Sequence, residues 1–342
     1  MKHLITGGCG FLGNLIAQRL LERGEQVRAL DVWEDPARHP DIEFVKADIC
    51  DREAVRRAMT GIDVVHHNAA LVPLTKSGGE FWRVNVNGSR MAAEEAVRGA
   101  VRCFVHMGSS AIFGAPKQAP VTLHTPPQPA EAYGRSKLAG ENAVRQICEA
   151  AGLQCIVIRP RTILGPGRFG IFQILFDWIR EGRNVYVIGS GDIAFQFVHA
   201  HDLMDAYLLA MARGKSGTYN IGADRYGTLR EALENLIAHA GTASRVRSLP
   251  ENLTIRTLQV LDWLHLSPLA PWHYLTYHKP FCFDVGHVLE LGWRPRYSND
   301  EMLREAYDSF CAAAGTADAP AVASPHRKRV KESILWLVKK LS

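Results

Sequence analysis

The chain lacks the patterns that would indicate a disulfide framework or a metal site. Its 342 residues include seven cysteines, none of them paired as C-x-x-C. Cys103 and Cys155 fall in apolar runs, where a reduced cysteine behaves as a small core residue. The grouped histidines at 66–67 and at 199 and 201 do not form a metal-binding set. We therefore expect no metal and a reducing, cytoplasmic setting.

Long hydrophobic runs and a strong charge of one sign are also missing. No apolar stretch is long enough to span a bilayer, and we expect no signal peptide before the first apolar run. The formal net charge is only +5, and the body of the chain has no basic stripe with interleaved aromatic residues. These absences argue against a nucleic-acid partner. A content of 47% hydrophobic residues is typical of one large or two modest globular domains.

The first 160 residues show a regular alternation of strand and helix patterns. Strands are predicted at residues 2–6, 26–31, 43–47, 62–67, 102–107 and 153–159. Helices are predicted at 11–23, 51–60, 80–99 and 131–151. Near-continuous apolar strands alternating with helices indicate a parallel sheet covered on both faces. The predicted fold class is α/β, a Rossmann-type doubly wound parallel sheet with a smaller C-terminal substrate-capping region.

A glycine-rich turn follows the first predicted strand. Residues 6–13 read T-G-G-C-G-F-L-G, and a strand leading into such a turn and then a helix forms a site for a dinucleotide pyrophosphate. Gly7 permits the tight turn, Gly10 lets the backbone approach the phosphates, and Gly13 lets the helix pack on the sheet. Asp31 ends the next strand and is placed to accept hydrogen bonds from both ribose hydroxyls of an adenosine. This arrangement predicts NAD rather than NADP.

Beyond Pro160 the pattern is less regular and predicts a division of the chain. Residues 1–165 form the NAD-binding domain, to which 196–221 return, and residues 166–195 and 222–311 form the substrate-binding region. Residues 312–325 are typical of a flexible linker. Residues 326–342 are predicted to form a basic amphipathic helix. Two interpretations of this tail carry equal weight: peripheral contact with the inner face of an anionic membrane, or docking on its own domain or a second subunit.

The residues that carry chemistry are Tyr133 and Lys137, in Y-G-R-S-K at the start of the helix at 131–151. Residues four apart share a helix face, so the ammonium group can lie below the phenol and the nicotinamide ribose. We expect this cation, together with the positive nicotinamide ring, to lower the pKa of Tyr133. Such a tyrosine can take a proton from a hydroxyl group while hydride passes to the cofactor.

In these motifs the chain resembles the extended short-chain dehydrogenase/reductases of the epimerase/dehydratase branch. The resemblance runs from the first strand to the linker and includes N-A-A at 68–70, N-V-N-G at 85–88, Ser109 five residues before Gly114, and L-G-W-R-P at 291–295. It implies that Ser109 hydrogen-bonds the reacting oxygen, that Tyr133 is the acid–base and that Lys137 holds the ribose. Ser110 replaces Ser109 if the loop is shifted by one residue. A homodimer formed through the helices at 80–99 and 131–151 is usual for this family.

The resemblance also implies two sets of binding residues. The cofactor set is Gly7, Gly10, Phe11, Leu12, Gly13, Asp31, Asp48, Ile49, Asn68, Ala69, Ala70, Asn85, Tyr133, Lys137, Arg159 and Pro160. The substrate set is Ser110, Thr162, Arg168 and Gln196. For Asn85, a role as a hydrogen bonder that stabilises the helix has equal weight. The aromatic residues at 263, 272, 274 and 277 are expected in the core or the cap, where an apolar substrate could use them.

The substrate motif departs from that of the nucleotide-sugar members. Those enzymes have an arginine, which clamps the substrate diphosphate, where Phe195 stands here, and an aromatic ring cannot replace its bidentate contact. Arg161, Arg168 or Arg183 could supply a displaced clamp.

Two functions therefore remain open. The first hypothesis is an NAD-dependent nucleotide-sugar epimerase resembling UDP-glucose 4-epimerase, supported by G-P-G at 165–167 and G-S-G-D at 189–192. The alternative is an NAD(P)-dependent oxidoreductase of the 3β-hydroxysteroid dehydrogenase type, acting on a lipid, sterol or isoprenoid alcohol or ketone. The lost arginine, the apolar-aromatic tract at 253–283 and the tail favour this second hypothesis. Intact Ser109, Tyr133 and Lys137 argue against a regulator that binds the cofactor without turnover.

Overall fold

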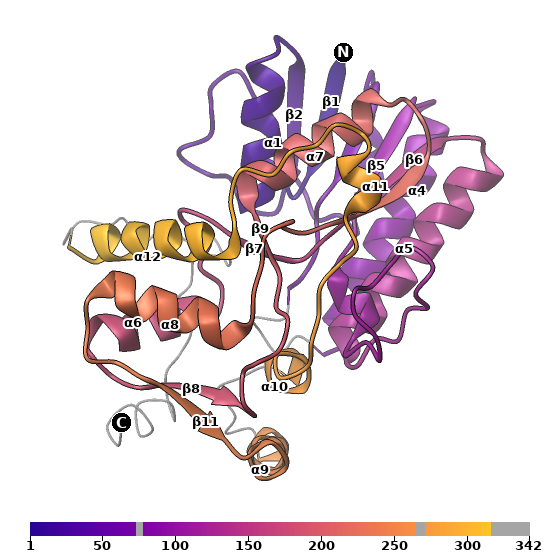
Figure 1. Cartoon of the computed structure of the whole chain (residues 1–342). Coiled ribbons are helices and arrows are strands. Elements are labelled where there is room, and N and C mark those ends of the chain that lie inside the picture. Colours follow the sequence, from indigo (N-terminus) through magenta and orange to yellow (C-terminus); the bar gives the residue numbers. More distant parts are fainter. Residues whose placement is uncertain (73–77, 265–270, 316–342) are drawn as a thin grey trace.

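Seven strands form one parallel sheet at the centre of the larger region. The computed structural model describes residues 1–72, 78–264 and 271–315 (Figure 1). The sheet has the strand order β10-β6-β5-β4-β1-β2-β3, and each pair of neighbours is parallel. Its members are β1 (Lys2–Thr6), β2 (Gln26–Asp31), β3 (Glu43–Lys46), β4 (Val64–His67), β5 (Cys103–Met107), β6 (Gln154–Pro160) and β10 (Gly217–Ile221). The chain proceeds outward from β1 in one direction and from β4 in the other. This order confirms the predicted doubly wound α/β fold.

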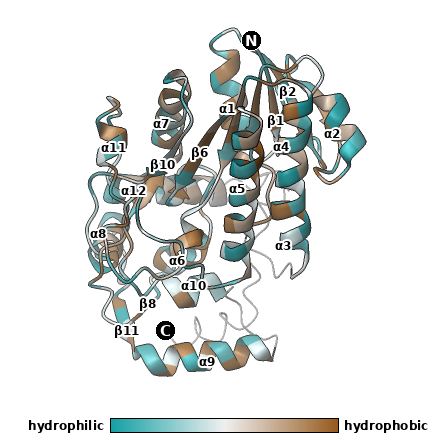
Figure 2. Cartoon of the chain, turned by 90° about the vertical axis from the view of Figure 1, so that its right-hand side faces the viewer, coloured by the Kyte–Doolittle hydropathy of each residue, from teal (hydrophilic) through white to brown (hydrophobic). Residues whose placement is uncertain are grey.

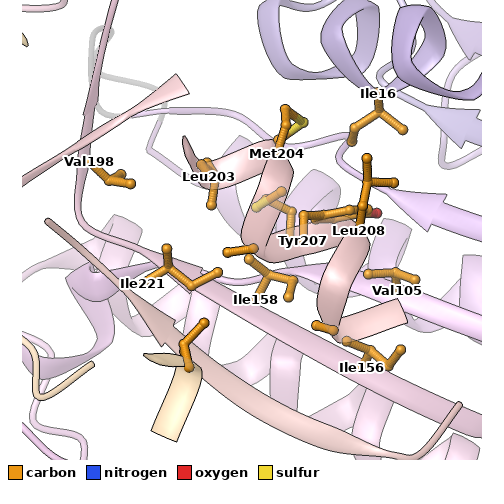
Figure 3. Packing of buried hydrophobic residues seen from close by; sticks show 14 of the residues in the cluster. Ile16, Val105, Ile156, Ile158, Val198, Leu203, Met204, Tyr207, Leu208 and Ile221 are labelled. Atoms are coloured by element: carbon orange, nitrogen blue, oxygen red, sulfur yellow. The ribbon is translucent and has the colours of Figure 1, made fainter. Parts of the chain in front are cut away.

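Helices cover both faces of this sheet (Figure 1). Helices α1 (Phe11–Leu21) and α7 (Ala200–Ala212) lie on one face, and α2 (Arg52–Ala58), α4 (Ser89–Arg98) and α5 (Ala132–Ala150) lie on the other. Side chains of a strand alternate between the faces, so Ile5 packs in the cluster that contains Ile16 and Tyr207, whereas Leu4 packs in the opposite cluster. Figure 3 shows α7 seated on β5 and β6 through Leu203, Met204 and Tyr207.

The segment predicted as one helix at 80–99 differs from that expectation. It consists of α3 (Glu80–Trp82), a π-helical turn over Arg83–Gly88 and then α4. The wider turn lies where α5 crosses very closely: a Cβ atom at Gly140 of α5 would stand 2.1 Å from the carbonyl oxygen of Asn85. Single π-turns of this kind are frequent at functional sites. Here the turn aims the Asn85 side chain at the loop that follows β4.

The rest of the chain builds a smaller region beside the carboxyl ends of the sheet strands (Figure 1). Strand β8 (Val185–Ile188) pairs with β11 (Val246–Leu249), and β7 (Thr162–Leu164) pairs with β9 (Phe197–His199). Their core is completed by α6 (Phe172–Arg180), α8 (Leu229–Ala240) and α12 (Asn299–Gly315). Helix α8 begins directly after Thr228, because Thr228 and Glu231 form a reciprocal capping box. Three further helices are α9 (Glu251–Trp263), α10 (Pro271–Thr276) and α11 (Gly286–Leu289).

The late segments connect the two regions. Strand β10 pairs with β6, and α7 packs on the large sheet, so residues 200–212 and 217–221 lie with the first region. The indole N–H of Trp293, in the L-G-W-R-P segment, donates to the Asp202 carbonyl at the start of α7 at 3.0 Å. The predicted domain boundaries stay a prediction.

The first four residues of the predicted linker lie in a helix. Helix α12 extends through residues 312–315, which are mostly alanine and therefore favour helix. The remaining linker residues and the tail at 326–342 lie outside the described residues. Within the described part of the chain, no helix has the length and apolar character needed to cross a bilayer.

Candidate active site

A cleft of about 380 Å³ lies at the carboxyl ends of β1 to β6. One side consists of the loops that follow these strands, and it includes the point between β1 and β4 where the strand order reverses. The smaller region supplies the facing side with residues 168–172 and with Trp272, His273 and Tyr277. A crevice at the carboxyl edge of such a sheet, beside the reversal of strand order, is where ligands bind in doubly wound folds. Its volume lies within the range of small-molecule sites.

The glycine turn forms a cradle that larger residues would fill. Gly7 has a φ of +67°, and a Cβ atom there would stand 2.9 Å from the backbone nitrogen of Ala69. A Cβ atom at Gly13 would stand 2.2 Å from the carbonyl oxygen of Gly7. Gly10 begins α1 without a side-chain cap, so the first-turn N–H groups of this helix have no side-chain acceptor there. A cradle of backbone N–H groups at a helix N-terminus fits a pyrophosphate.

Two carboxylates stand at the β2–β3 end of the cleft. The Asp31 carboxylate accepts hydrogen bonds from the backbone N–H groups of Cys9 at 3.1 Å and Trp33 at 3.3 Å. Burial raises the pKa of Asp31, although these hydrogen bonds act to lower it. Asp48 accepts from Arg83 at 2.9 Å. Burial acts to raise the pKa of Asp48, but hydrogen bonds from the Cys50 N–H and from Arg83 make the overall shift a lowering. Asp31 is therefore held beside the glycine turn, as a ribose acceptor would need to be.

Ser109, Tyr133 and Lys137 come together at the end of β5, and all three line the cleft. Ser109 follows β5 and caps a short 3₁₀ turn, where its hydroxyl accepts from the Ala111 N–H at 3.1 Å. Tyr133 lies in the first turn of α5, whose N-terminus is capped by the Glu131 carboxylate. Lys137 follows one turn later and donates to the Met107 carbonyl oxygen at 2.7 Å. The lysine thereby ties α5 to the strand end that carries Ser109.

The pKa of Tyr133 differs from the expectation that Lys137 lowers it. Burial raises the pKa of this phenol, while a hydrogen bond from Ser109 lowers it, Glu131 raises it and Arg168 lowers it. Burial also lowers the pKa of Lys137 to about 8, against the attraction of Glu141. Lys137 is directed at a backbone carbonyl, and desolvation acts against the charged form of both groups. The protein alone therefore does not favour the phenolate.

A buried chain of hydrogen bonds joins the glycine turn to Tyr133, and the sequence patterns did not reveal it. The Thr6 hydroxyl contacts Nδ1 of His67, and Nε2 of His67 contacts the Ser89 hydroxyl, both at 2.9 Å. From there the chain continues through Ser89 to the Asn85 carbonyl, from the Asn85 amide to Ser136, and from Ser136 to the Tyr133 carbonyl. Burial lowers the pKa of His67 to about 3, with a smaller contribution from Lys137, so the ring stays neutral. The only sequence signal is a histidine in an apolar strand.

Three predicted site residues do not line the cleft: Asn85, Arg159 and Gln196. The Asn85 amide accepts from the Leu71 N–H at 2.8 Å and donates to the Leu71 carbonyl at 3.1 Å, so it positions a loop that does line the cleft. Arg159 pairs with buried Glu141. Gln196 bonds the backbone of Ala223 and Phe283. The other predicted cofactor and substrate residues all border the cleft.

The place of the expected arginine is filled by core packing. Phe195 is 1% exposed, and its ring lies against those of Phe197 and Tyr277 at centroid distances of 5.1 and 5.2 Å. The Arg161 guanidinium lies 5.5 Å from the centroid of the Phe195 ring and borders the cleft. Arg168 also borders it, whereas Arg183 does not. Two of the three arginines considered as displaced clamps are therefore at the site.

The end of the cleft that Arg161 and Arg168 border is otherwise largely aromatic and apolar. Phe169, Phe172, Trp272 and Tyr277 line it, together with Ile163 and Ile171. Tyr277 packs against Phe195, and Trp272 meets Tyr277 edge to face at 6.4 Å. Within the part of the chain that the structure describes, no group of three or more side chains is arranged to hold a metal ion.

Comparison with known proteins places this geometry in a family. Residues 3–222 match the family model described as "NAD dependent epimerase/dehydratase family". An uncharacterized protein, y4nG of Sinorhizobium fredii, is 44% identical over 98% of this chain and 85% of its own length. Sterol demethylase protein B of Methylococcus capsulatus is 32% identical over 70% of this chain and 75% of its own. The crystal structure of Thermus thermophilus UDP-glucose 4-epimerase in complex with NAD matches with a TM-score of 0.75 and 25% identity, over 92% of this chain and 100% of that one.

Replacing the acidic residue at the end of β2 tests how the cleft recognises its cofactor. We expect Asp31→Ala to raise the Kd for NADH by about 10- to 100-fold, because a hydrogen bond to a charged group contributes about 1.5–3 kcal/mol. Discrimination against NADPH should weaken as well, since the carboxylate repels a 2′-phosphate. Fluorescence titration with both cofactors measures the change, and Asp31→Asn, which keeps the shape and one acceptor oxygen, is the control. A wild-type protein that binds NADPH more tightly than NADH would contradict this role.

Proposed function

Because the chain belongs to the NAD-dependent epimerase/dehydratase family, we propose that it moves hydride between NAD and a secondary alcohol carbon of its substrate. NAD is the cofactor of the family, as the glycine turn predicts. The observation that carries the proposal is the convergence of Ser109, Tyr133 and Lys137 on one wall of the cleft, beside the glycine cradle.

The roles of the three residues follow from where they are held. The substrate hydroxyl would lie between the Ser109 and Tyr133 oxygens, and Tyr133 would remove its proton. The bound nicotinamide supplies the hydride acceptor. Lys137, anchored on the Met107 carbonyl, would turn its remaining N–H groups to the ribose and keep a positive charge near the phenol. Since burial raises the pKa of Tyr133, the Ser109 hydrogen bond, the Arg168 charge and the positively charged cofactor together would bring it toward working pH.

Removing the phenol and its hydrogen-bond partner gives different signatures. Tyr133→Phe should lower kcat/KM by about 100-fold or more at every pH, since acid–base catalysis contributes about 10²- to 10⁴-fold. Ser109→Ala should lower kcat/KM and move the rising limb of the pH profile for alcohol oxidation to higher pH, because the Ser109 hydrogen bond lowers the pKa of Tyr133. Steady-state rates across pH measure both. Full activity in Tyr133→Phe would exclude the acid–base role, and a shift in Ser110→Ala alone would assign the role of Ser109 to Ser110.

For the substrate, the geometry best supports a largely apolar alcohol. Four aromatic residues line the end of the cleft that Arg161 and Arg168 border. The ring of Phe195 fills the place where nucleotide-sugar enzymes of this family have an arginine. An aromatic wall favours contact with hydrocarbon through burial of apolar surface, at about 25 cal/mol per Å². The similarity to a protein named for sterol demethylation is consistent with this substrate class. The reaction would then be a net oxidation or reduction that consumes one NAD or NADH per turnover.

Nucleotide-sugar epimerisation is the second candidate, and a specific observation favours it. Arg161 lies against the Phe195 ring, so a cation borders the cleft near the place of the missing arginine, although it comes from the junction between β6 and β7. The overall similarity to UDP-glucose 4-epimerase is in the same direction. In this reaction the alcohol is oxidised and the ketone is reduced again on its other face, so NAD is regenerated.

The two candidates differ in whether reduced cofactor accumulates. We expect stoichiometric NADH when the full chain is supplied with NAD and a 3β-hydroxysteroid or a long-chain secondary alcohol, followed by absorbance at 340 nm. UDP-glucose and UDP-galactose should give neither NADH nor interconversion by chromatography. Interconversion of these sugars without NADH would establish the second candidate instead, and Tyr133→Phe controls for non-enzymatic change in either assay.

A cytoplasmic protein in peripheral contact with a membrane is also part of the proposal. The tail at 326–342 has Val330, Ile334, Leu337 and Leu341 at helical spacing among basic residues. Helix α9, which Figure 2 shows at the edge of the molecule away from the large sheet, exposes Leu253, Val260 and Trp263 by 66%, 56% and 79%. A basic amphipathic segment and exposed apolar side chains suit an anionic lipid surface.

Deleting the tail tests this contact. A chain ending at Ser324 should lose binding to phosphatidylglycerol-containing vesicles in a sedimentation assay, while its Kd for NADH stays unchanged. The loss should also be reproduced by high salt in the full chain, since attraction to anionic lipid is screened. Vesicle binding that survives the deletion excludes the tail as the membrane contact.

We also propose that the protein is a homodimer joined through α4 and α5. These helices lie together on one outer face of the sheet, as Figure 2 shows, and Trp82 just before the π-helical turn is 46% exposed. Sedimentation equilibrium should then give twice the chain mass of 37.9 kDa. Trp82→Glu should shift the protein toward the monomer, and a wild-type mass of one chain would exclude the dimer.

A further inference from the structure

Arg161 is a buried cation without a buried anion. Arg161 is only 3% exposed, and it borders the cleft. Among the described residues, no carboxylate lies within ion-pair distance of its guanidinium. Two residues earlier on the same segment, buried Arg159 has the usual solution, a pair of contacts with the Glu141 carboxylate. The two neighbouring arginines therefore differ in what balances their charge.

Neutral groups hold the Arg161 guanidinium in place. Its Nε donates to the Gln196 carbonyl at 3.2 Å, and one terminal nitrogen donates to the Ser110 hydroxyl at 3.2 Å. The ring of Phe281 lies 3.8 Å from the central carbon, a cation–π contact, and Phe195 lies at 5.5 Å. Burial lowers the pKa of Arg161 to about 10, so it remains charged at neutral pH. These contacts orient the guanidinium group, but they do not neutralise its charge.

A charge in this position is costly unless something compensates it. Transfer of an unpaired ion from water to a protein interior carries a large desolvation penalty, which proteins usually offset with a counter-charge. An apolar residue of similar size would fill the same aromatic pocket without that penalty. The remaining terminal nitrogen of Arg161 has no hydrogen-bond acceptor among the residues described, and the side chain reaches the cleft at Ser110, next to Ser109.

We propose that Arg161 binds an anionic group of the substrate, a carboxylate or a phosphate, close to the hydroxyl that reacts. This inference rests on the proposed function, because it assigns the substrate hydroxyl to Ser109 and Tyr133. It identifies the substrate as an acid whose remaining surface contacts the aromatic wall. Arg161 is then a specificity-determining residue supplied by the segment after β6, in place of the arginine replaced by Phe195.

Binding measurements at saturating NADH test the site without relying on turnover. The probes are 3-hydroxypalmitate, its uncharged methyl ester, and UDP, titrated into the full chain by calorimetry. The wild type should bind at least one of the two anions about tenfold or more tightly than the ester. Arg161→Met should abolish that preference and leave the Kd of the ester and of NADH within about twofold, whereas Arg161→Lys should keep part of it. If Arg161→Met weakens the binding of UDP but not that of 3-hydroxypalmitate, the anion that Arg161 binds is a phosphate.

The opposite results are equally defined. A wild-type protein that binds neither anion more tightly than the ester overturns the proposal, as does an Arg161→Met variant that keeps the wild-type preference. If Arg161→Met loses NADH binding through misfolding, the proposal is tested by two other measurements. These are the ratio of the Kd of the ester to the Kd of the anion in the wild type, and the same ratio in Arg161→Lys. Failure of the proposed function has a separate signature. In that case, Tyr133→Phe would keep full turnover, whatever the anion preference proves to be.

Discussion

The geometry of the cleft depends on the buried hydrogen-bond chain between Thr6 and Tyr133. Thr6 directly precedes the glycine turn, and Tyr133 lies on the helix that crosses the opposite face of the sheet. His67 stands between two hydroxyl groups, and a neutral imidazole has the one donor and one acceptor that this position requires. A buried polar group without a partner costs about 1–3 kcal/mol, so each member of the chain restricts its neighbours to one arrangement. The residue before the glycine turn and the backbone of Tyr133, in the first turn of α5, are thereby linked through buried hydrogen bonds.

The same cleft separates charge along its length. Asp31 and Asp48 stand at the end formed by β2 and β3, whereas Lys137, Arg161 and Arg168 stand toward β5, β6 and the smaller region. Burial acts on the two kinds of group in opposite directions: it raises the pKa of Asp31 and lowers the pKa of Lys137. A ligand with hydroxyl groups at one end and negative charge at the other would fit this polarity.

Local patterns were sufficient where neighbours in sequence decide the structure. The glycine turn, the start of α5 and the Thr228 capping box all follow from residues within a few positions of each other. The strand and helix alternation likewise predicted the sheet, because apolar runs of this length between helices have few other uses. By contrast, the π-helical turn over Arg83–Gly88 was missed. It arises where α5 packs against the turn at Gly140, a contact between distant parts of the chain.

The sequence by itself determined the doubly wound fold and the NAD-binding turn, and it predicted an acidic residue beside that turn and a serine, a tyrosine and a lysine suited to a substrate hydroxyl group. Only the tertiary structure decided how burial and neighbouring charges shift the pKa values of those groups and which cations border the cleft. Burial, which raises the pKa of Tyr133, and the direction of Lys137 toward Met107 depend on packing between α5 and β5. Arg161 and Phe195 meet because β7 pairs with β9. Desolvation and long-range contact are properties of the folded chain, and no short segment contains them.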